Sequence, residues 1–318
     1  MHSSTPPPRY SLRQLRYFVV TAEALSFTAA SKQLHISQPA ISSTLADLED
    51  SFGVQLFIRH HASGLSLTQS GKDMLALARN LLKSADELQT AASDLDGGMR
   101  GQIYLGCLIT LAPSLLPQLI SRFMAQHRSM RFDTCETDQQ DLLARLQDGR
   151  VDIGLTYNLD LPPDILFTPL VDLPPYIILP KQHRLAGAGA VSLSSLLDEP
   201  YVMLDLPHSR EYFASLFDVF GRQPEAAFRS SQPEVIRGMV ANGLGYSMLN
   251  FPLRSTCTVD GKEFAICEVQ EKAQAMTLGI ARLRSMRQRK AVHLFEQFCT
   301  EVLSENTKLV QPLHQEDV

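Results

Sequence analysis

The sequence predicts a multidomain α+β protein with three successive parts: a winged helix-turn-helix, one long helix and an α/β region. Three observations lead to this prediction. Apolar residues recur at helical spacing up to Phe52 and are followed by two short strand-like runs. A heptad pattern continues from Met74 to Leu95 without a break. From Gly101 onward, apolar strands alternate with amphipathic helices, which is typical of a parallel sheet.

The stretch from Ser26 to Phe57 predicts two helices packed across a tight turn. The first helix has Ala29, Ala30 and Leu34 on one face, and it ends at the turn before Ser37. The second helix repeats apolar residues at steps of four, three and four, namely Ile41, Leu45, Leu48 and Phe52. We expect Ser37 to cap this helix and Pro39 to lie in its first turn, where a missing N–H costs nothing.

The outward face of the second helix carries polar side chains that suit a DNA groove: Gln38, Ser42, Ser43 and Glu49. An ordinary pair of helices is the alternative interpretation. The surroundings favour the DNA-binding one, because an amphipathic helix precedes the pair and two strand-like runs follow it. The helix carries Leu12, Leu15, Phe18, Val19, Ala22 and Leu25, and the runs cover Val54–Arg59 and Leu65–Thr68. Three helices and two strands make a winged helix-turn-helix over residues 11–70.

The order of motifs resembles that of LysR-type transcriptional regulators over nearly the whole chain. The segment LRQLRYFVVTAEALSFTAASKQLHISQPAISSTLADLEDSFGVQLFIR is followed by LSLTQSG and then by a long helix. The resemblance implies a regulator that binds an inverted-repeat operator in double-stranded DNA. We expect bases to be read by Gln38, Pro39 and Ser42, and the DNA backbone to be contacted by Thr28, Lys32, Ser43 and Arg59. The family often has a basic residue where Ser43 or Ala46 stands here.

The charge of the chain argues for more than one copy on the DNA. Its 318 residues carry a net charge of −5, and residues 1–70 contain few cations, namely Arg9, Arg13, Arg16, Lys32 and Arg59. Because phosphate contacts supply most nonspecific affinity, we expect that affinity to be modest and dimerisation to double the contacts.

The long helix, predicted over residues 71–98, offers a surface for such pairing. Its apolar seam consists of Met74, Ala78, Leu81, Ala85, Leu88, Ala92 and Leu95. We expect a homodimer or homotetramer. The alternative is a helix that packs only on its own domain.

Residues 101–305 predict two α/β lobes that the chain crosses twice. Lobe I is expected at about 101–171 and 275–305, and lobe II at about 172–274. This pattern resembles the effector domain of LysR-type regulators, which is built like periplasmic solute-binding proteins. Residues 1–10 and 306–318 are expected to be flexible ends.

A small-molecule effector is expected at the carboxyl ends of the strands, where helix N-termini face the crevice between the lobes. The candidate residues are Thr110, Thr156, Tyr157, Asp205, His208, Ser209 and Phe251. In relatives a Ser or Thr four residues after the strand glycine helps to bind carboxylates, and Thr110 stands at that spacing from Gly106. Asp205, Tyr157 and Phe251 would instead suit a cationic or aromatic ligand. Thr110 and Ser209 also suit simple helix caps, His208 a surface histidine, and Asp205 a loop anchor.

The alternative interpretations of the chain are a solute-binding protein and an enzyme built on the bilobed domain. The N-terminal stretch MHSSTPPPRY has no apolar core like that of a secretion signal, and no run approaches the roughly 20 apolar residues of a membrane helix. Catalytic motifs such as G-x-S-x-G and H-E-x-x-H are absent. We therefore expect a cytoplasmic regulator, not an enzyme, with no metal, no cofactor and no membrane partner, and with RNA polymerase as a further partner.

The five cysteines have no C-x-x-C pair and are predicted to be reduced thiols in the cytoplasm. Peroxide-sensing LysR-type regulators carry their cysteines in the region that matches Tyr201–Phe220, and this chain has none there. A redox sensor is therefore disfavoured.

Overall fold

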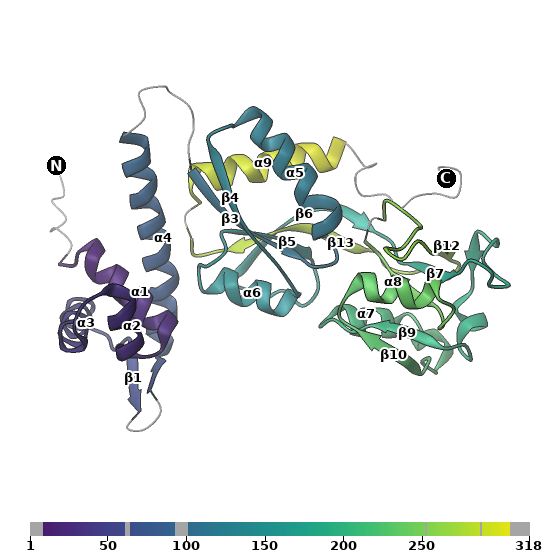
Figure 1. Cartoon of the computed structure of the whole chain (residues 1–318), viewed down its shortest axis with the longest axis horizontal. Helices are drawn as coiled ribbons and strands as arrows, with labels where there is room; N and C mark the ends of the chain where they lie inside the picture. The colour runs from purple at the N-terminus through teal and green to yellow at the C-terminus, as the bar shows by residue number, and fades with distance from the viewer. Residues whose placement is uncertain (1–8, 61–63, 93–100, 252, 287, 306–318) are drawn as a thin grey trace.

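The computed structural model describes residues 9–60, 64–92, 101–251, 253–286 and 288–305. The expected flexible tail at 306–318, residues 1–8 of the expected flexible N-terminus and Leu95 of the heptad seam lie outside the described residues. The winged domain comes first along the chain, α4 (Gln69–Ala92) stands beside it, and two α/β lobes follow (Figure 1). The predicted architecture of winged helix-turn-helix, long helix and bilobed α/β domain is confirmed.

The winged domain contains α1 (Leu12–Ala24), α2 (Phe27–Leu34) and α3 (Gln38–Phe52), followed by the antiparallel pair β1 (Phe57–His60) and β2 (Gly64–Leu67). The predicted cap is present, because the Ser37 side chain accepts a hydrogen bond from the Ala40 N–H. A core of apolar side chains joins α1 and α3 to the wing, and it includes Phe18, Ile41, Leu45, Leu48 and Leu56. Leu12 and Leu25, expected on the buried face of α1, are exposed instead.

α4 begins where the wing ends, and the Thr68 hydroxyl accepts a hydrogen bond from the Gly71 N–H at 2.8 Å, as expected of a cap. Gly71 is required here, since a Cβ at this position would lie 2.2 Å from the Leu56 carbonyl oxygen. The helix therefore packs directly on the wing. Leu75 and Ala78 are buried there, so part of the predicted heptad seam covers the chain's own winged domain.

Lobe I is a five-stranded sheet in the order β4-β3-β5-β13-β6. Its strands are β3 (Gly101–Leu108), β4 (Met130–Thr137), β5 (Ile153–Tyr157), β6 (Ile165–Leu173) and β13 (Met276–Leu283). β3 pairs in parallel with β4 and β5, as predicted, whereas β13 runs antiparallel to β5 and β6. Figure 1 shows α5 (Ala112–Gln126) and α9 (Lys290–Glu305) on one face of the sheet and α6 (Gln139–Gln147) on the other.

Lobe II contains a four-stranded sheet, β11-β7-β12-β8, and the parallel pair β10-β9. The strands are β7 (Tyr176–Pro180), β8 (Ala190–Val191), β9 (Tyr201–Leu204), β10 (Ala226–Ser230), β11 (Ser247–Leu249) and β12 (Phe264–Val269). Its helices are α7 (Ser209–Ser215) and α8 (Pro233–Ala241), with 3-10 turns η1 (Leu193–Leu196) and η2 (Asp218–Phe220). The first helix after β9 ends at Ser215, before η2 begins. One continuous apolar core extends through both lobes.

Candidate functional site

The first turns of α2 and α3 bring the predicted DNA-contacting residues onto one exposed face of the winged domain. Gln38, Pro39 and Ser43 are exposed on α3, and Ser42 is half-buried beside them. The Thr28 hydroxyl of α2 donates a hydrogen bond to Gln38 Oε1 at 3.3 Å. Because this bond orients the Gln38 amide, its N–H₂ group is left available to an acceptor outside the protein.

Lys32 and Arg59 extend this face on two sides. Lys32 is exposed in the last turn of α2. Arg59 is exposed on β1, and its guanidinium lies 5.2 Å from the centre of the Phe27 ring at the start of α2. The stacking holds the wing cation close to the helix pair.

Glu49 does not belong to this face, so its expected outward position is wrong. Its Oε1 accepts hydrogen bonds from the backbone N–H groups of Leu56 and Phe57, at 2.7 and 3.1 Å. The carboxylate thus ties the last part of α3 to the first strand of the wing. A sequence pattern does not show this, because an acidic residue on the polar side of a helix has the same spacing whether it is solvated or half-buried. Only the folded position of the following segment decides between the two.

A cavity of about 460 Å³ lies between the two lobes. Such a volume falls within the range of small-molecule sites. Lobe I contributes Thr110 and the start of α5, and lobe II contributes the start of α8. The residues that line the cavity include Thr110, Ser114, Gln232, Phe251, Leu253 and Cys257.

Two features make this cavity favourable for negative charge. The N-terminal residues of α5 and α8 both line it, and neither helix start has a side-chain cap. Helix N-termini carry partial positive charge and unpaired N–H groups. Thr110 is only 5% exposed, and its Oγ1 lies near the Tyr157 hydroxyl without the geometry of a hydrogen bond to any described residue.

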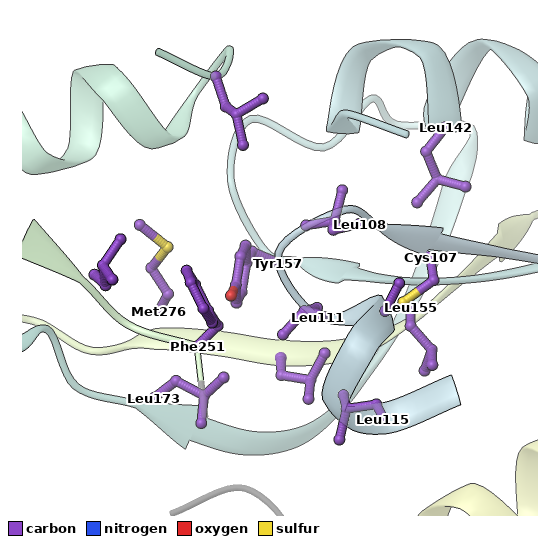
Figure 2. Packing of buried hydrophobic residues seen from close by; sticks show 14 of the residues in the cluster. Cys107, Leu108, Leu111, Leu115, Leu142, Leu155, Tyr157, Leu173, Phe251 and Met276 are labelled. Carbon is purple, nitrogen blue, oxygen red and sulfur yellow. The ribbon is translucent and has the colours of Figure 1, made fainter. Parts of the chain in front are cut away.

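Tyr157 lies beneath the cavity in the apolar core rather than on its surface. Figure 2 shows it among buried residues that include Phe251, Leu108 and Met276. Its hydroxyl donates to Asn250 Oδ1 at 3.4 Å, and burial raises the pKa of Tyr157 well above its ordinary value. Thr156 is fully buried on β5. Both residues are therefore buried and do not line the cavity.

The remaining predicted residues form a separate group at the start of α7. Asp205 pairs with Arg210 at 2.8 Å, so it anchors its own loop, which was the alternative interpretation. His208 Nδ1 lies 3.1 Å from Asp160 Oδ2, a contact that bridges the two lobes. Ser209 is buried and is the first residue of α7. These residues do not line the 460 Å³ cavity.

The structure thus brings together Thr110 and Phe251 among the seven predicted effector residues. Gln232 and Ser114 were missed, although one signal pointed to the first. Gln232 follows the strand Ala226–Ser230 and precedes α8, which is the same position at a strand's carboxyl end that singled out Thr110. The cation-binding hypothesis loses its support, because Asp205 is already paired with Arg210 and Tyr157 is buried.

The thiols offer little reactivity in the interior. Cys107 and Cys299 are fully buried, and burial raises the pKa of each thiol above its ordinary value. Cys257 is exposed at the cavity. Among the described residues no group of His, Cys, Asp or Glu has the arrangement of a metal site, and no helix is long and apolar enough to cross a membrane.

A winged helix-turn-helix joined to a bilobed α/β domain with a cavity between its lobes defines a class: DNA-binding proteins that respond to a small ligand. Comparison with known families agrees with this. The model of the bacterial regulatory helix-turn-helix protein, lysR family, matches residues 12–72, and that of the LysR substrate binding domain matches residues 96–304. The chain belongs to the LysR family of transcriptional regulators.

Individual relatives support the same assignment. The crystal structure of HinK, a LysR family transcriptional regulator from Pseudomonas aeruginosa, is 40% identical, covers 93% of this chain and 99% of its own, and gives a TM-score of 0.63. The HTH-type transcriptional regulator YnfL of Escherichia coli strain K12 is 32% identical over 243 residues, which is 75% of this chain and 81% of YnfL. The hydrogen peroxide-inducible genes activator of Dickeya chrysanthemi is 30% identical over 240 residues, 75% of this chain and 78% of the activator.

Family membership decides between the functional classes considered from the sequence. The protein is a DNA-binding transcriptional regulator with an effector-binding domain, and it is neither an enzyme nor a solute carrier.

Proposed function

We propose that two or more copies of the chain bind an inverted-repeat operator, each with the N-terminal turn of α3 in the major groove. The observation that supports this most directly is the exposed set Gln38, Pro39 and Ser43, with Thr28 orienting Gln38. Gln38 reads one base, Pro39 and Ser42 contact neighbouring base edges, and Thr28, Lys32, Ser43 and Arg59 position the DNA backbone. The regulator acts in the cytoplasm, and RNA polymerase is its downstream partner.

Substitution of two residues separates base reading from backbone contact. Gln38→Ala is expected to reduce discrimination at one base pair per half-site by about 1–3 kcal/mol. Arg59→Ala is expected to weaken specific and random DNA alike and to lower the salt dependence. Binding titrations over a range of salt concentrations on operator and random duplexes measure both. An equal loss on both duplexes for Gln38→Ala would contradict base reading by Gln38.

We propose that the copies pair through the exposed apolar side of α4. Leu77, Leu81 and Leu88 are exposed there, and Leu81 and Leu88 belong to the predicted heptad seam. Their spacing of four and seven residues places them along one line of the helix. Leu88 is 73% exposed, which is unusual for a leucine in a helix that is otherwise well packed. A second copy of α4 is the occupant that this spacing suits.

A matched pair of variants tests the pairing surface. Leu88→Glu is expected to raise the dimer dissociation constant by roughly tenfold or more, because burial of a leucine contributes about 1.5–3 kcal/mol. Val219→Glu is the control, since Val219 is also an apolar residue 73% exposed but lies in lobe II. Sedimentation equilibrium measures both. Equal dimerisation of the two variants and the parent chain would exclude Leu88 from the interface.

We propose that the effector is a small organic acid whose carboxylate lies near Thr110 and the starts of α5 and α8. Support comes from the two uncapped helix starts and from the Thr110 hydroxyl, which finds no hydrogen-bond partner among the described residues. Phe251 and Leu253 contribute apolar wall for the body of the ligand. Peroxide sensing, as in the name of the Dickeya relative, is not proposed for this chain, because residues 201–220 contain no cysteine.

The rate at which the exposed Cys257 thiol is alkylated reports whether a ligand occupies the cavity. This measurement can be made before the natural effector is known. Calorimetry against panels of carboxylates and amines identifies binders, and a binder at this cavity is expected to slow alkylation of Cys257 by a maleimide. Thr110→Val, which keeps the shape and removes the hydroxyl, is expected to weaken a carboxylate by roughly tenfold. If only amines bind, or if binders leave Cys257 alkylation unchanged, the proposed ligand or its position is wrong.

A further inference from the structure

α4 presents three chemically different sides to its surroundings. Leu75 and Ala78 are buried against the winged domain, and the line through Leu81 and Leu88 is exposed. The third side meets lobe I of the same chain, and it is polar apart from Ala76, which is buried in the core of that lobe. This side, called here the junction face, consists of Arg79, Asn80, Lys83 and Glu87.

Charged groups from three segments meet where the junction face contacts lobe I. Lys83 Nζ lies 2.8 Å from Asp152 Oδ1 and over the Tyr104 ring, 3.9 Å from its centre. Arg289 pairs with Asp152 at 2.5 Å and also with Glu87. The side chains of Lys83, Asp152 and Arg289 are 13%, 12% and 6% exposed, so the cluster is largely withdrawn from water.

Arg79 connects the winged domain to lobe I through a single side chain. Its Nη2 lies 2.9 Å from Glu23 Oε1 on α1, and its Nη1 donates to the Asp148 carbonyl oxygen at the end of α6. The Arg79 side chain is 6% exposed. The orientation of α1 relative to lobe I is therefore coupled to the position of this one residue on α4.

The chemistry of the junction face suits reversible docking. A buried ionic contact gains attraction but loses hydration, so its net stability is small even where its geometry is good. Burial indeed lowers the pKa of Lys83, which reports that lost hydration. When the two sides separate, the charges regain water, and Ala76 is the fully buried apolar residue of α4 that this side uncovers. The apolar contact of α4 with the winged domain has no such compensation, so these two parts stay together.

We propose that Lys83 and Glu87 are positioning residues that hold the winged domain and α4, as one unit, in a fixed orientation on lobe I. When the winged domain and α4 are docked on lobe I, the recognition helix of each chain has one defined position relative to that lobe. When this unit separates from lobe I, the recognition helix is free to adopt another position. The inference rests on the proposed pairing of copies only where half-site spacing is concerned, and the docking itself is a property of the single chain.

The double variant Lys83→Gln/Glu87→Gln tests docking without a change in net charge. It removes the α4 side of the cluster and leaves the Arg289–Asp152 pair and the bond from the Tyr104 N–H to Asp152 within lobe I. Lys72→Gln/Asp73→Gln is the control, because both residues are exposed on the same helix. Hydrogen exchange of peptides that cover Asp148–Asp152 in the full chain is expected to become about tenfold faster or more in the first variant only. Its radius of gyration by X-ray scattering is expected to rise.

DNA binding separates a positioning role from a merely structural one. The Gln/Gln variant is expected to keep the parent affinity for a duplex with one half-site and to lose its preference for one spacing between two half-sites. Lys83→Arg, which keeps the cation, is expected to restore slow exchange when Glu87 is present. Unchanged exchange and scattering in the Gln/Gln variant would overturn the proposal, and so would a loss of single half-site binding in parallel with faster exchange. Loss of half-site binding with docking intact would instead count against the assigned DNA contacts.

Discussion

Thr110 and Asp205 show how far a single residue can be interpreted from its place in the chain. Both follow an apolar strand and precede a helix, so both were expected in the ligand cleft. Thr110 lines the cavity with an unpartnered hydroxyl, whereas Asp205 is held by Arg210 of its own loop. The difference is one of local pairing. A cation lies within reach of the aspartate, whereas the threonine hydroxyl lies near the Tyr157 hydroxyl without forming a well-aligned hydrogen bond.

Glu49 was predicted on the outward face of the recognition helix, but its carboxylate binds the backbone of the wing. This difference leads to a direct prediction. Glu49→Ala removes the acceptor for the N–H groups of Leu56 and Phe57 and leaves the wing poorly tied to α3. The free energy of unfolding is expected to fall by about 1–3 kcal/mol, because buried N–H groups lose a charged acceptor. Urea unfolding monitored by circular dichroism measures the loss.

The neighbouring Asp50 provides the control for Glu49. It is exposed on the same turn of α3, and Asp50→Ala removes the same charge from that turn. We expect this variant to unfold within about 0.5 kcal/mol of the parent chain. Equal destabilisation by the two substitutions would mean that charge, and not the bonds to the wing, accounts for the effect.

At the scale of elements, α4 shows why a heptad pattern alone does not define an interface. Its apolar residues at steps of four and three were assigned to one partner helix. The structure divides them, since Ala78 is covered by the winged domain while Leu81 and Leu88 remain exposed. A helix has several sides, and a repeat specifies which residues share a side without specifying which neighbour meets it.

The turn after α6 lies close to α4, and a substitution in this turn tests how closely α4 packs on lobe I. Gly149 has a φ of +67°, and a Cβ there would lie 3.0 Å from both the Cα and the carbonyl oxygen of Ala76 on α4. Gly149→Ala is therefore expected to combine the strain of a left-handed backbone, about 1 kcal/mol, with a clash against the helix. Hydrogen exchange of the segment 145–152 and the thermal unfolding midpoint measure the outcome.

Gly221 separates these two contributions. Its φ is +62°, and a Cβ there would meet open space. Gly221→Ala is expected to cost only the backbone strain, so the difference between the two variants reports the contact with α4. If both variants lower the midpoint equally, the turn does not pack against α4 in solution.

At the scale of the whole molecule, the two lobes share one apolar core in which several tyrosines are buried. Tyr157 belongs to lobe I, while Tyr176, Tyr201 and Tyr246 belong to lobe II. Burial raises the pKa of each phenol above its ordinary value of 10.0. The folded chain therefore keeps these protons at a pH where the unfolded chain has released them.

This difference predicts a loss of stability in alkali. Above pH 10.0 the unfolded state binds fewer protons than the folded state, so the free energy of unfolding falls as pH rises; well below pH 10.0 these groups have no effect. Each tyrosine contributes about 1.4 kcal/mol per pH unit until its folded pKa is reached. The pKa of Lys83 is lowered instead, so this single group makes the free energy of unfolding rise with pH.

Urea unfolding at about pH 9 and about pH 11, with tyrosinate absorbance as a second probe, measures the alkaline loss. We expect a lower free energy of unfolding at the higher pH, and late ionisation of the buried phenols in the folded chain. Equal stability at the two values would show that the phenols are not buried as described.

The sequence by itself determined the kinds of elements, their order and the family. The cap at Ser37 and the parallel start of lobe I follow from local spacing, which is written in consecutive residues. Only the tertiary structure decided which polar groups are partnered. Glu49 holds the wing, Asp205 holds Arg210, and Arg79 joins Glu23 to lobe I. Such pairs join residues whose distance in space is set by the folded chain, and no local periodicity encodes it.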